Sequence, residues 1–353
     1  MQPFNTEYRL FFKKLTYLEG RSISSTGLKV LSFNIERDLL TKTTSSFEVL
    51  QAPQAIENGD IVGMYDSFGT ILFLGVVSYI EINRIEAHQI YEIFDDNWLW
   101  NNPRKNTLEE TIKQIIYNDY QNSSDTLINS IFDAFILDTT SSTQQYLYTE
   151  EDNYVVNFAS YLYDIYEKYG IVLDFNIPFE EDTPTIDIGV KNLPKLSISN
   201  NVLVFTNFNI TTNIFETNKL VIYDQEGNYR TTFYATTSGI VQDPSALNRL
   251  QRVNTAIVFS DDDLSIIEAS HLRNQMFNHE ISCELVINNK LLPLDKIILG
   301  QECDIYYDGA YFNSVLTGYS MSMTNERPSE MITLKFGLVR TDLTSKLFKK
   351  LGG

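Results

Sequence analysis

Residues 59–75 read GDIVGMYDSFGTILFLG, and residues 300–318 read GQECDIYYDGAYFNSVLTG. Each stretch begins at a glycine, runs through a short apolar segment to a turn with Tyr-Asp and Gly, and returns through a second apolar segment to another glycine. Such a pattern is typical of a β-hairpin. Because the same unit occurs near each end, the sequence predicts two similar small β-domains in one chain, an arrangement that favours assembly over catalysis.

Further strands surround both hairpins. An alternating strand is predicted before each one, at 47–50 and at 281–287. The nearly continuous apolar run at 70–82 predicts a strand that is covered on both faces. Polar and apolar residues also alternate at 31–36, 319–323 and 332–338. This period of two indicates half-buried strands, so both ends of the chain are predicted to be rich in β-structure.

Residues 101–180 differ in character and are predicted to form a helical insert. Thr107 and Glu110 have the spacing of a capping box at the start of a first helix. A second helix is predicted to begin near Ser124 or Asp125. The apolar positions at helical spacing in these two helices are Leu108, Ile112, Ile115 and Ile116, then Leu127, Ile128, Ile131, Phe132 and Phe135.

A polar loop at 139–145 and a third helix at 153–169 complete the predicted insert. Gly170 occupies the position where a glycine commonly ends a helix. The apolar stripe of this helix is Phe158, Tyr161, Leu162, Ile165 and Tyr169.

Strands return between residues 185 and 260. The turn residues at 224–228 (DQEGN) predict a hairpin. Ser260 with the aspartates that follow it predicts a helix cap, and the helix is expected to run to about residue 278. The clearest strands are 202–205, 220–223 and 231–235, and the predicted helix face is Leu264, Ile267, His271 and Leu272.

Composition limits the function classes. The 353 residues include 46 acidic and 27 basic ones, for a net charge of −19. Such a surface repels phosphate backbones, which argues against ordinary nucleic-acid binding but would suit a pore through which DNA slides. The N-terminus lacks an apolar signal region, and the longest apolar run, 71–77, is only strand-sized. We therefore expect synthesis in a cytoplasm and no membrane segment.

No catalytic, cofactor-binding or metal-binding residue is predicted. Phosphate-binding loops, dinucleotide motifs and nucleophile elbows are absent from the sequence. His271 and His279 are eight positions apart, which does not predict a shared metal, and His88 is the remaining histidine. Cys283 and Cys303 fall in apolar-alternating strands and are expected to be buried thiols. Asp261, Asp262 and Asp263 could bind calcium, but a capping role is favoured because the calcium-loop pattern is missing.

Asp95 and Asp96 beside Trp98 and Trp100 allow three interpretations. Paired acids near indole rings could bind or hydrolyse a sugar. The tryptophans could instead anchor the helical insert on the first β-domain, which is the favoured interpretation, or they could form a surface for a partner protein.

The chain resembles the phage tail baseplate hub proteins, including the N-terminal structural part of tail-associated proteins in long-tailed phages. Three segments carry the resemblance, in the same order of elements. The first is 47–75, with Pro53, Gly59 to Val62, Gly69 and Phe73. The second is the helix-to-strand passage 264–287, followed by Gly300, Asp304, Asp308-Gly309 and Thr317-Gly318. The third is 333–347, TLKFGLVRTDLTSKL, with Phe336-Gly337, Arg340 and Asp342-Leu343-Thr344.

The resemblance implies an α+β, mostly β fold, with two tail-tube-like β-barrels related by internal duplication and a helical α+β insert between them. The expected domains are a first barrel at 1–100, the insert at 101–184, a β-rich connecting domain or part of the second barrel at 185–260, and the second barrel with its helix at 261–353. Three chains would form a ring that adapts a sixfold tail tube to a threefold tip.

By the same resemblance, the protein is expected to be a non-enzymatic part of the tail tip in the virion, made in the host bacterial cytoplasm. It would cap the tube and open for DNA passage. Expected partners are two further copies, tail-tube or distal tail proteins, the tape-measure protein and receptor-binding or tip proteins. The alternative is a carbohydrate-binding or carbohydrate-hydrolysing protein of a tail or cell wall.

The sequence departs from larger relatives because it ends soon after the tube-like part, without an extension that would carry a cell-wall hydrolase or fibre domain. Cell-wall degradation by this chain is therefore not expected. Gly59, Gly69, Gly300 and Gly309 are expected to adopt backbone conformations that favour glycine, as ordinary turn residues or as assembly positions. Arg340 and Asp342 could form an interface salt bridge or an exposed pair.

Overall fold

The computed structural model describes residues 7–13, 27–67, 69–99, 106–122, 135–144, 155–177, 184–212, 217–236, 239–242, 253–273, 277, 279–286, 291–324 and 327–338. The described part is mostly β-structure with few helices, as the sequence predicts. Arg340, Asp342 and the second predicted helix up to residue 134 lie outside these residues. Phe135, the last apolar position predicted for that helix, is not helical and directly precedes the strand Ile136–Thr139.

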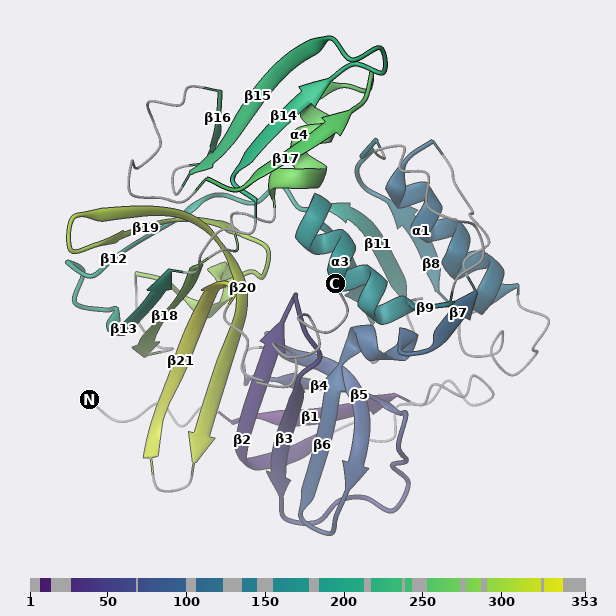
Figure 1. Cartoon of the computed structure of the whole chain (residues 1–353). Coiled ribbons are helices and arrows are strands. Elements are labelled where there is room, and N and C mark those ends of the chain that lie inside the picture. Colours follow the sequence, from purple (N-terminus) through teal and green to yellow (C-terminus); the bar gives the residue numbers. More distant parts are fainter. Residues whose placement is uncertain are drawn as a thin grey trace.

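Six strands near the N-terminus close into a ring. They are β1 (Arg9–Lys13), β2 (Leu28–Asp38), β3 (Thr44–Val49), β4 (Ile61–Tyr65), β5 (Ile71–Ile80) and β6 (Arg84–Gln89). The pairing order is β1-β4-β5-β6-β3-β2, and β2 pairs again with β1. The ring forms the lower part of Figure 1. The predicted hairpin at 59–75 is β4 and β5.

Six strands from the C-terminal half pair in a similar order. They are β12 (Leu196–Ser199), β13 (Thr206–Thr212), β18 (His279–Val286), β19 (Glu302–Tyr307), β20 (Ala310–Thr324) and β21 (Arg327–Gly337). The order is β12-β19-β20-β21-β18-β13, and the predicted hairpin at 300–318 is β19 with the start of β20. Among the described residues β13 does not pair with β12, so this set is an open sheet and not a closed ring.

Strands β2 and β20 join the two sets into one twelve-stranded sheet. The first half of β20 pairs with β19, and its second half pairs with β2. A single hydrophobic core runs along the inner side of both sets, with Phe33, Phe47, Met321 and Phe336 among its members. The two β-rich ends of the chain therefore share one core.

The hairpin glycines take the conformations that the sequence predicts. Gly59, Gly69, Gly300 and Gly309 have φ angles of 95°, 83°, 89° and 81°, in the left-handed region that favours glycine. The first glycine of each hairpin also makes an equivalent backbone bond, because Gly59 donates to the Val77 carbonyl and Gly300 to the Leu316 carbonyl, at 2.8 and 2.9 Å.

The insert covers one outer side of the ring. It contains α1 (Leu108–Ile116), a π-helical turn at Tyr117–Gln121, α3 (Phe158–Tyr169), a three-stranded sheet and a short ribbon, and it follows the 3-10 helix η1 (Ile90–Phe94). The sheet is β10 (Ile171–Asn176), β11 (Thr185–Val190) and β8 (Ile136–Thr139), and the ribbon is β7 (Asn97–Leu99) with β9 (Val155–Asn157). The second hydrophobic cluster includes Leu74 of β5, so residues 72–75 are buried on both faces of the sheet. The prediction of a strand covered on both faces over 70–82 is therefore correct only for this part, because Ile71, Tyr79 and Ile82 are exposed.

The ends of the insert helices follow local chemistry. The Thr107 side chain accepts a hydrogen bond from the Glu110 amide, and Gly170 ends α3 with φ 74°. The predicted start of the third helix at 153 is wrong by several residues. Asn157 caps α3 through the Ser160 amide, and residues 155–157 are held as a strand by pairing with β7.

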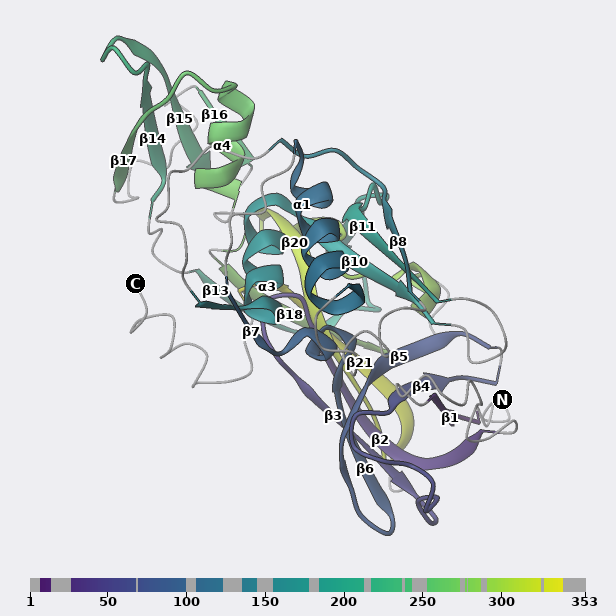
Figure 2. The same cartoon turned by 90° about the vertical axis from the view of Figure 1, so that its right-hand side faces the viewer.

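A third unit projects beyond the insert, at the end of the molecule opposite the ring (Figure 2). It is a four-stranded sheet with α4 (Leu264–Leu272) packed on one face; Leu220, Phe233 and Ile267 form part of its small core. The strands are β16 (Gly239–Val241), β15 (Tyr229–Thr236), β14 (Lys219–Tyr223) and β17 (Thr255–Phe259). The predicted turn at 224–228 joins β14 to β15.

Two sequence predictions in this region are wrong. Residues 202–205 form a turn, with Val202 bonded to the Ser199 carbonyl and Phe205 to the Val202 carbonyl, and Leu203 is 96% exposed. The strand begins afterwards, at Thr206. Helix α4 ends at Leu272, earlier than residue 278; its predicted cap is correct, because the Asp263 side chain accepts from the Ser265 amide.

Candidate functional surface

One face of the joined sheet is polar across five neighbouring strands. Because opposite residues in paired strands lie on the same face, the register defines it. Glu36 of β2 lies opposite Ser320 of β20, Ser320 opposite Thr333 of β21, and Thr333 opposite Glu284 of β18. We call the polar residues of this face the polar sheet face; at one end of it, Met331 and Val286 lie in register with Ser322. The polar sheet face comprises Ser46 and Glu48; Asn34 and Glu36; Ser320 and Ser322; Thr333 and Lys335; and Glu280, Ser282 and Glu284.

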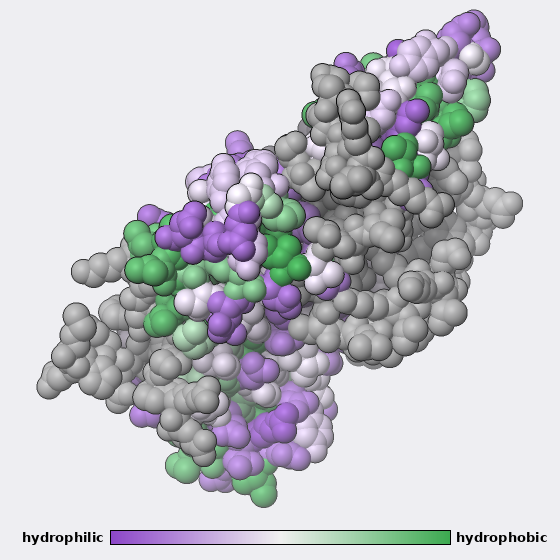
Figure 3. Space-filling model, turned by 60° about the vertical axis from the view of Figure 1, so that its left-hand side comes forward, coloured by the Kyte–Doolittle hydropathy of each residue, from purple (hydrophilic) through white to green (hydrophobic). Residues whose placement is uncertain are grey.

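The charge of the polar sheet face is negative. Its carboxylates belong to Glu36, Glu48, Glu280 and Glu284, and its single amine, that of Lys335, belongs to a residue that is only 5% exposed. The Lys335 Nζ lies 3.8 Å from Glu36 Oε1. The side of the molecule that contains β12, β13, β18 and β21 is hydrophilic over much of its described surface, with apolar residues in small groups (Figure 3). Such a face offers hydroxyls and carboxylates, which do not attract phosphate groups.

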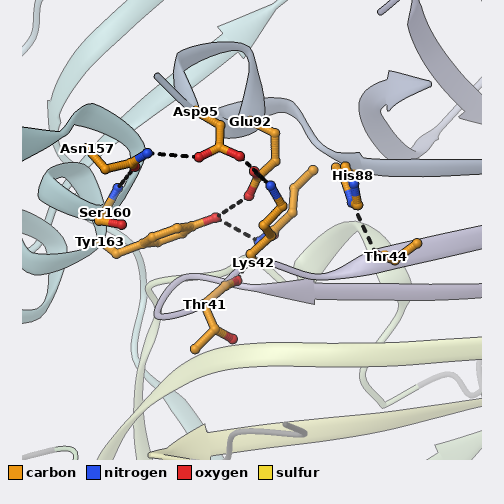
Figure 4. A network of polar contacts seen from close by, with 10 residues as sticks. Thr41, Lys42, Thr44, His88, Glu92, Asp95, Asn157, Ser160 and Tyr163 are labelled. Atoms are coloured by element: carbon orange, nitrogen blue, oxygen red, sulfur yellow. Dashed lines mark hydrogen bonds and ion pairs between the residues drawn. The ribbon is translucent and has the colours of Figure 1, made fainter. Parts of the chain in front are cut away.

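A second polar cluster joins the ring to the insert (Figure 4). Lys42, in the loop between β2 and β3, pairs with Glu92 at 2.7 Å and also with Asp95. From α3, the Tyr163 hydroxyl donates to Glu92 Oε1 at 3.2 Å, and the cap residue Asn157 donates to Asp95 at 2.9 Å. We call Lys42, Glu92, Asp95, Asn157 and Tyr163 the joint network.

The pKa values of the two carboxyl groups in the joint network are shifted in opposite directions. The pKa of Asp95 is lowered, chiefly by the hydrogen bond from Lys42. Burial raises the pKa of Glu92, although the bond from Lys42 opposes this shift. Both carboxylates are occupied by contacts between the ring and the insert. Sequence reasoning missed Lys42, Glu92 and Tyr163, because no spacing pattern relates a loop lysine to two residues of distant elements.

The other sequence candidates near this network have structural contacts. Asp96 accepts a bond from the Asn97 amide, and its backbone carbonyl accepts one from Phe158. The backbone of Trp98 pairs with Val156 in the ribbon that links the ring to α3. Trp100 lies outside the described residues.

The histidines lie in separate places. His88 contacts Thr44 at 3.1 Å on the outer side of the ring, whereas His279 is buried in β18, with its Nε2 2.6 Å from Ser314 Oγ. His271 lies on α4, and burial lowers its pKa. Among the described residues there is no group of three or more His, Cys, Asp or Glu side chains that could hold a metal ion.

Both cysteines are buried and free, as predicted. Burial raises the pKa of the Cys283 thiol to about 12, and it also raises the pKa of Cys303. Thiols in this state are poor nucleophiles. Asp261 accepts a hydrogen bond from the Gln225 amide, in the turn between β14 and β15, and Asp262 makes hydrogen bonds with the neighbouring Ser260 hydroxyl.

The comparisons with known proteins identify the fold. No protein-family model matches the chain, and no curated protein sequence matches it. Its structure is similar to that of the tail protein from Neisseria meningitidis MC58, with a TM-score of 0.54 and 11% identity over 93% of this chain and 96% of that one. This chain therefore shares the fold of that tail protein, in agreement with the resemblance seen in the sequence.

Two other solved structures overlap over similar lengths. The 43 kDa tail protein of prophage MuSo2 from Shewanella oneidensis has a TM-score of 0.49 and 10% identity, over 94% of this chain and 98% of that chain. Prophage tail protein gp18 from Listeria monocytogenes EGD-e has a TM-score of 0.49 and 13% identity, over 98% and 100%. Within the described part of this chain, no helix is long and apolar enough to cross a membrane.

Proposed function

We propose that this protein is a structural, non-enzymatic component of a phage tail tip: a baseplate hub that forms a trimeric ring, caps the tail tube and opens for DNA passage. The observation that carries the proposal is a repeated strand order within a fold shared with a tail protein. The proposed domains are those that the sequence predicts, with two boundaries moved. The insert extends past residue 184 to include β11, which pairs with β10 and β8, and α4 is grouped with β14 to β17, whose small core it shares.

The repeated order supports an internal duplication. In chain order, β1 to β6 correspond to β12, β13, β18, β19, β20 and β21, and five of the six pairings of the first set recur in the second. The backbone bonds of Gly59 and Gly300 recur with them. The second set differs in two respects: β12 pairs with β19 in parallel, whereas β1 pairs with β4 in antiparallel, and the sixth pairing is missing among the described residues.

Two similar units in each of three chains would present six similar surfaces to a sixfold tail tube and threefold symmetry to the tip. In such a ring we place the polar sheet face on the channel wall, because it spans both units and presents acidic and hydroxyl groups. DNA would pass along this wall without binding, since like charges repel. The proposed partners are tail-tube or distal tail proteins, the tape-measure protein and tip proteins.

The proposed location is the virion tail tip, after synthesis in the host cytoplasm. Light scattering of the purified protein over a range of concentrations tests the assembly. We expect a mass of three times the 40.6 kDa chain and, in electron micrographs, a threefold ring with a central channel. A dimer, a tetramer or a chain that stays monomeric at every concentration would contradict self-assembly of this ring.

A further inference from the structure

A cavity of about 390 Å³ lies where the ring, the insert and the C-terminal half meet. Its wall is formed by strands β2, β5, β10 and β20 and by the segment around the 3-10 helix η5 (Leu294–Lys296). This volume is within the range of small-molecule sites, and such sites are commonly found where structural units meet.

Most of the wall is apolar, with Leu72, Val172 and Leu299 among its residues. The two tyrosine hydroxyls in the wall are already used as donors. Tyr91 donates to the Leu173 carbonyl at 3.0 Å, and Tyr319 donates to the Leu72 carbonyl at 3.2 Å. These bonds fix the wall and leave no hydroxyl proton of these tyrosines for a ligand.

Arg37 supplies an unused hydrogen-bond donor. Its Nη1 makes a long contact of 3.4 Å to the Tyr319 hydroxyl, and its guanidinium lies 5.8 Å from the centre of that ring. The Nε atom is fully buried and has no hydrogen-bond partner. No carboxylate of the described residues lies within ion-pair distance of Arg37. A guanidinium stays charged in proteins, so the buried Nε donor of Arg37 is left without the carboxylate partner that it favours.

The other charges in the wall pair with each other. Lys191 Nζ lies 2.8 Å from Asp174 Oδ2, and the Asp174 side chain is 56% exposed. The wall therefore has one carboxylate for two cations, although the whole chain carries a net charge of −19. A ligand that adds one negative charge beside Arg37 would balance the cavity and would complete the planar, two-bond geometry of an arginine–carboxylate pair.

We propose that this cavity binds a carboxylate on a short apolar stem, with the carboxylate on Arg37 and the stem against the apolar wall. The carboxylate could be a free small acid or an acidic side chain of another polypeptide, since both have this chemistry. A bound group would contact the ring, the insert and the C-terminal half at once, and it would hold the insert in place against both sets of strands.

The test uses hexanoate and its neutral counterpart hexanamide with the full-length protein. Titration by NMR, with labelled Ile and Leu methyl groups, follows Ile71, Leu72 and Leu299 in the wall. We expect hexanoate to shift these methyl signals with an affinity at least roughly ten times higher than that of hexanamide. Equal binding of the two compounds, or no shift at these methyl groups, would overturn the proposal. This comparison needs no variant, so it decides the question even if an Arg37 variant fails to fold.

Two variants test whether the charge of Arg37 is the one that binds hexanoate. R37M should reduce hexanoate binding at least roughly tenfold. R84M is the matched control, because Arg84 is an exposed arginine on β6 that pairs with Glu86 at 2.6 Å, and it should bind like wild type. Unchanged binding by R37M would overturn the assignment. The peptide acetyl-Leu-Glu-Leu-amide then identifies the source: binding tighter than that of hexanoate indicates a protein segment, and weaker binding indicates a free acid.

Discussion

At the scale of single residues, His279 makes the stability of the fold sensitive to pH. Burial lowers its pKa from 6.5 to about 4, because a charged imidazole loses its hydration in the core. The folded protein keeps His279 neutral, whereas the unfolded chain takes up a proton below pH 6.5. His279 therefore does not reduce the unfolding free energy above pH 6.5, and the unfolding free energy falls as the pH is lowered from 6.5 towards 4.

The His279→Gln variant should not show this loss of unfolding free energy at low pH. Between pH 7 and pH 4 the wild-type protein is expected to lose about 3 kcal/mol more unfolding free energy than the variant. Urea denaturation at several pH values measures the difference, and above pH 7 both proteins should show the same pH dependence. Parallel curves over the whole range would show that His279 does not cause the effect.

Gly75 tests the close packing inside the ring. A Cβ atom there would lie 2.1 Å from the backbone carbonyl oxygen of His88 on the neighbouring strand. Gly75→Ala should therefore cost about 3 kcal/mol of unfolding free energy, because neither strand can move away easily. Gly227→Ala is the control. Gly227 has φ 91° but open space around it, so only backbone strain of about 1 kcal/mol is expected. Similar thermal shifts for the two variants would contradict this account.

At the scale of elements, Glu109 fixes the loop after β8 to helix α1. The carboxylate is fully buried and accepts bonds from the Ser141 hydroxyl at 2.5 Å and from the Thr143 amide and hydroxyl at 2.8 and 2.7 Å. Burial opposes ionisation, but these bonds outweigh it and hold the pKa of Glu109 below its ordinary value. The stabilisation by the Glu109 carboxylate is expected to be present above the pKa that Glu109 has in the unfolded chain. It is expected to be lost as the pH falls through the lower pKa that Glu109 has in the folded protein.

Glu109→Ala should destabilise the protein by about 2 kcal/mol and speed hydrogen exchange in residues 140–144, because these residues lose their acceptor. The neighbouring Glu110 is the control. It is exposed and accepts one bond, from Thr139 at 3.1 Å, so Glu110→Ala should leave exchange in the loop nearly unchanged. Exchange that is equally slow in both variants would contradict the role of Glu109.

The elements that the sequence predicts correctly are those specified by local chemistry. The Thr107 cap, the Gly170 helix end and the hairpin glycines each depend on residues within a few positions. The segment 202–205 misleads because its apolar residues match a strand, although local hydrogen bonds hold it in a turn. Neither the β2–β20 pairing nor the joint network could be predicted, because each depends on contacts between residues far apart in the chain.

At the scale of the whole molecule, the proposed channel wall makes a prediction about DNA. Glu48→Lys with Glu284→Lys reverses two charges on the polar sheet face. If this face lines the channel, the double variant should bind duplex DNA at least roughly ten times more tightly than wild type, and salt should weaken the binding. Electrophoretic retardation of linear DNA measures the effect.

The control variant carries the same change of charge elsewhere, at the exposed Glu110 and Glu302, both changed to Lys. It should bind DNA much more weakly than the variant of the polar sheet face. Equal binding by the two double variants would show that total charge decides, and would remove the support for a channel wall at this face.

The pairing of β2 with β20 also has a consequence for the order of events during synthesis. All strands of the ring lie in the first part of the chain, so the ring can form while the ribosome is still making the insert. The partner of β2 comes much later, since Arg37 and Tyr319 are 282 positions apart. We expect one edge of β2 to stay unpaired in the newly made N-terminal part until β20 is synthesised, and an unpaired strand edge can pair with other chains. Asn34 and Glu36 lie on the solvent side of β2, and they keep this unpaired edge hydrophilic until β20 and β21 have been synthesised.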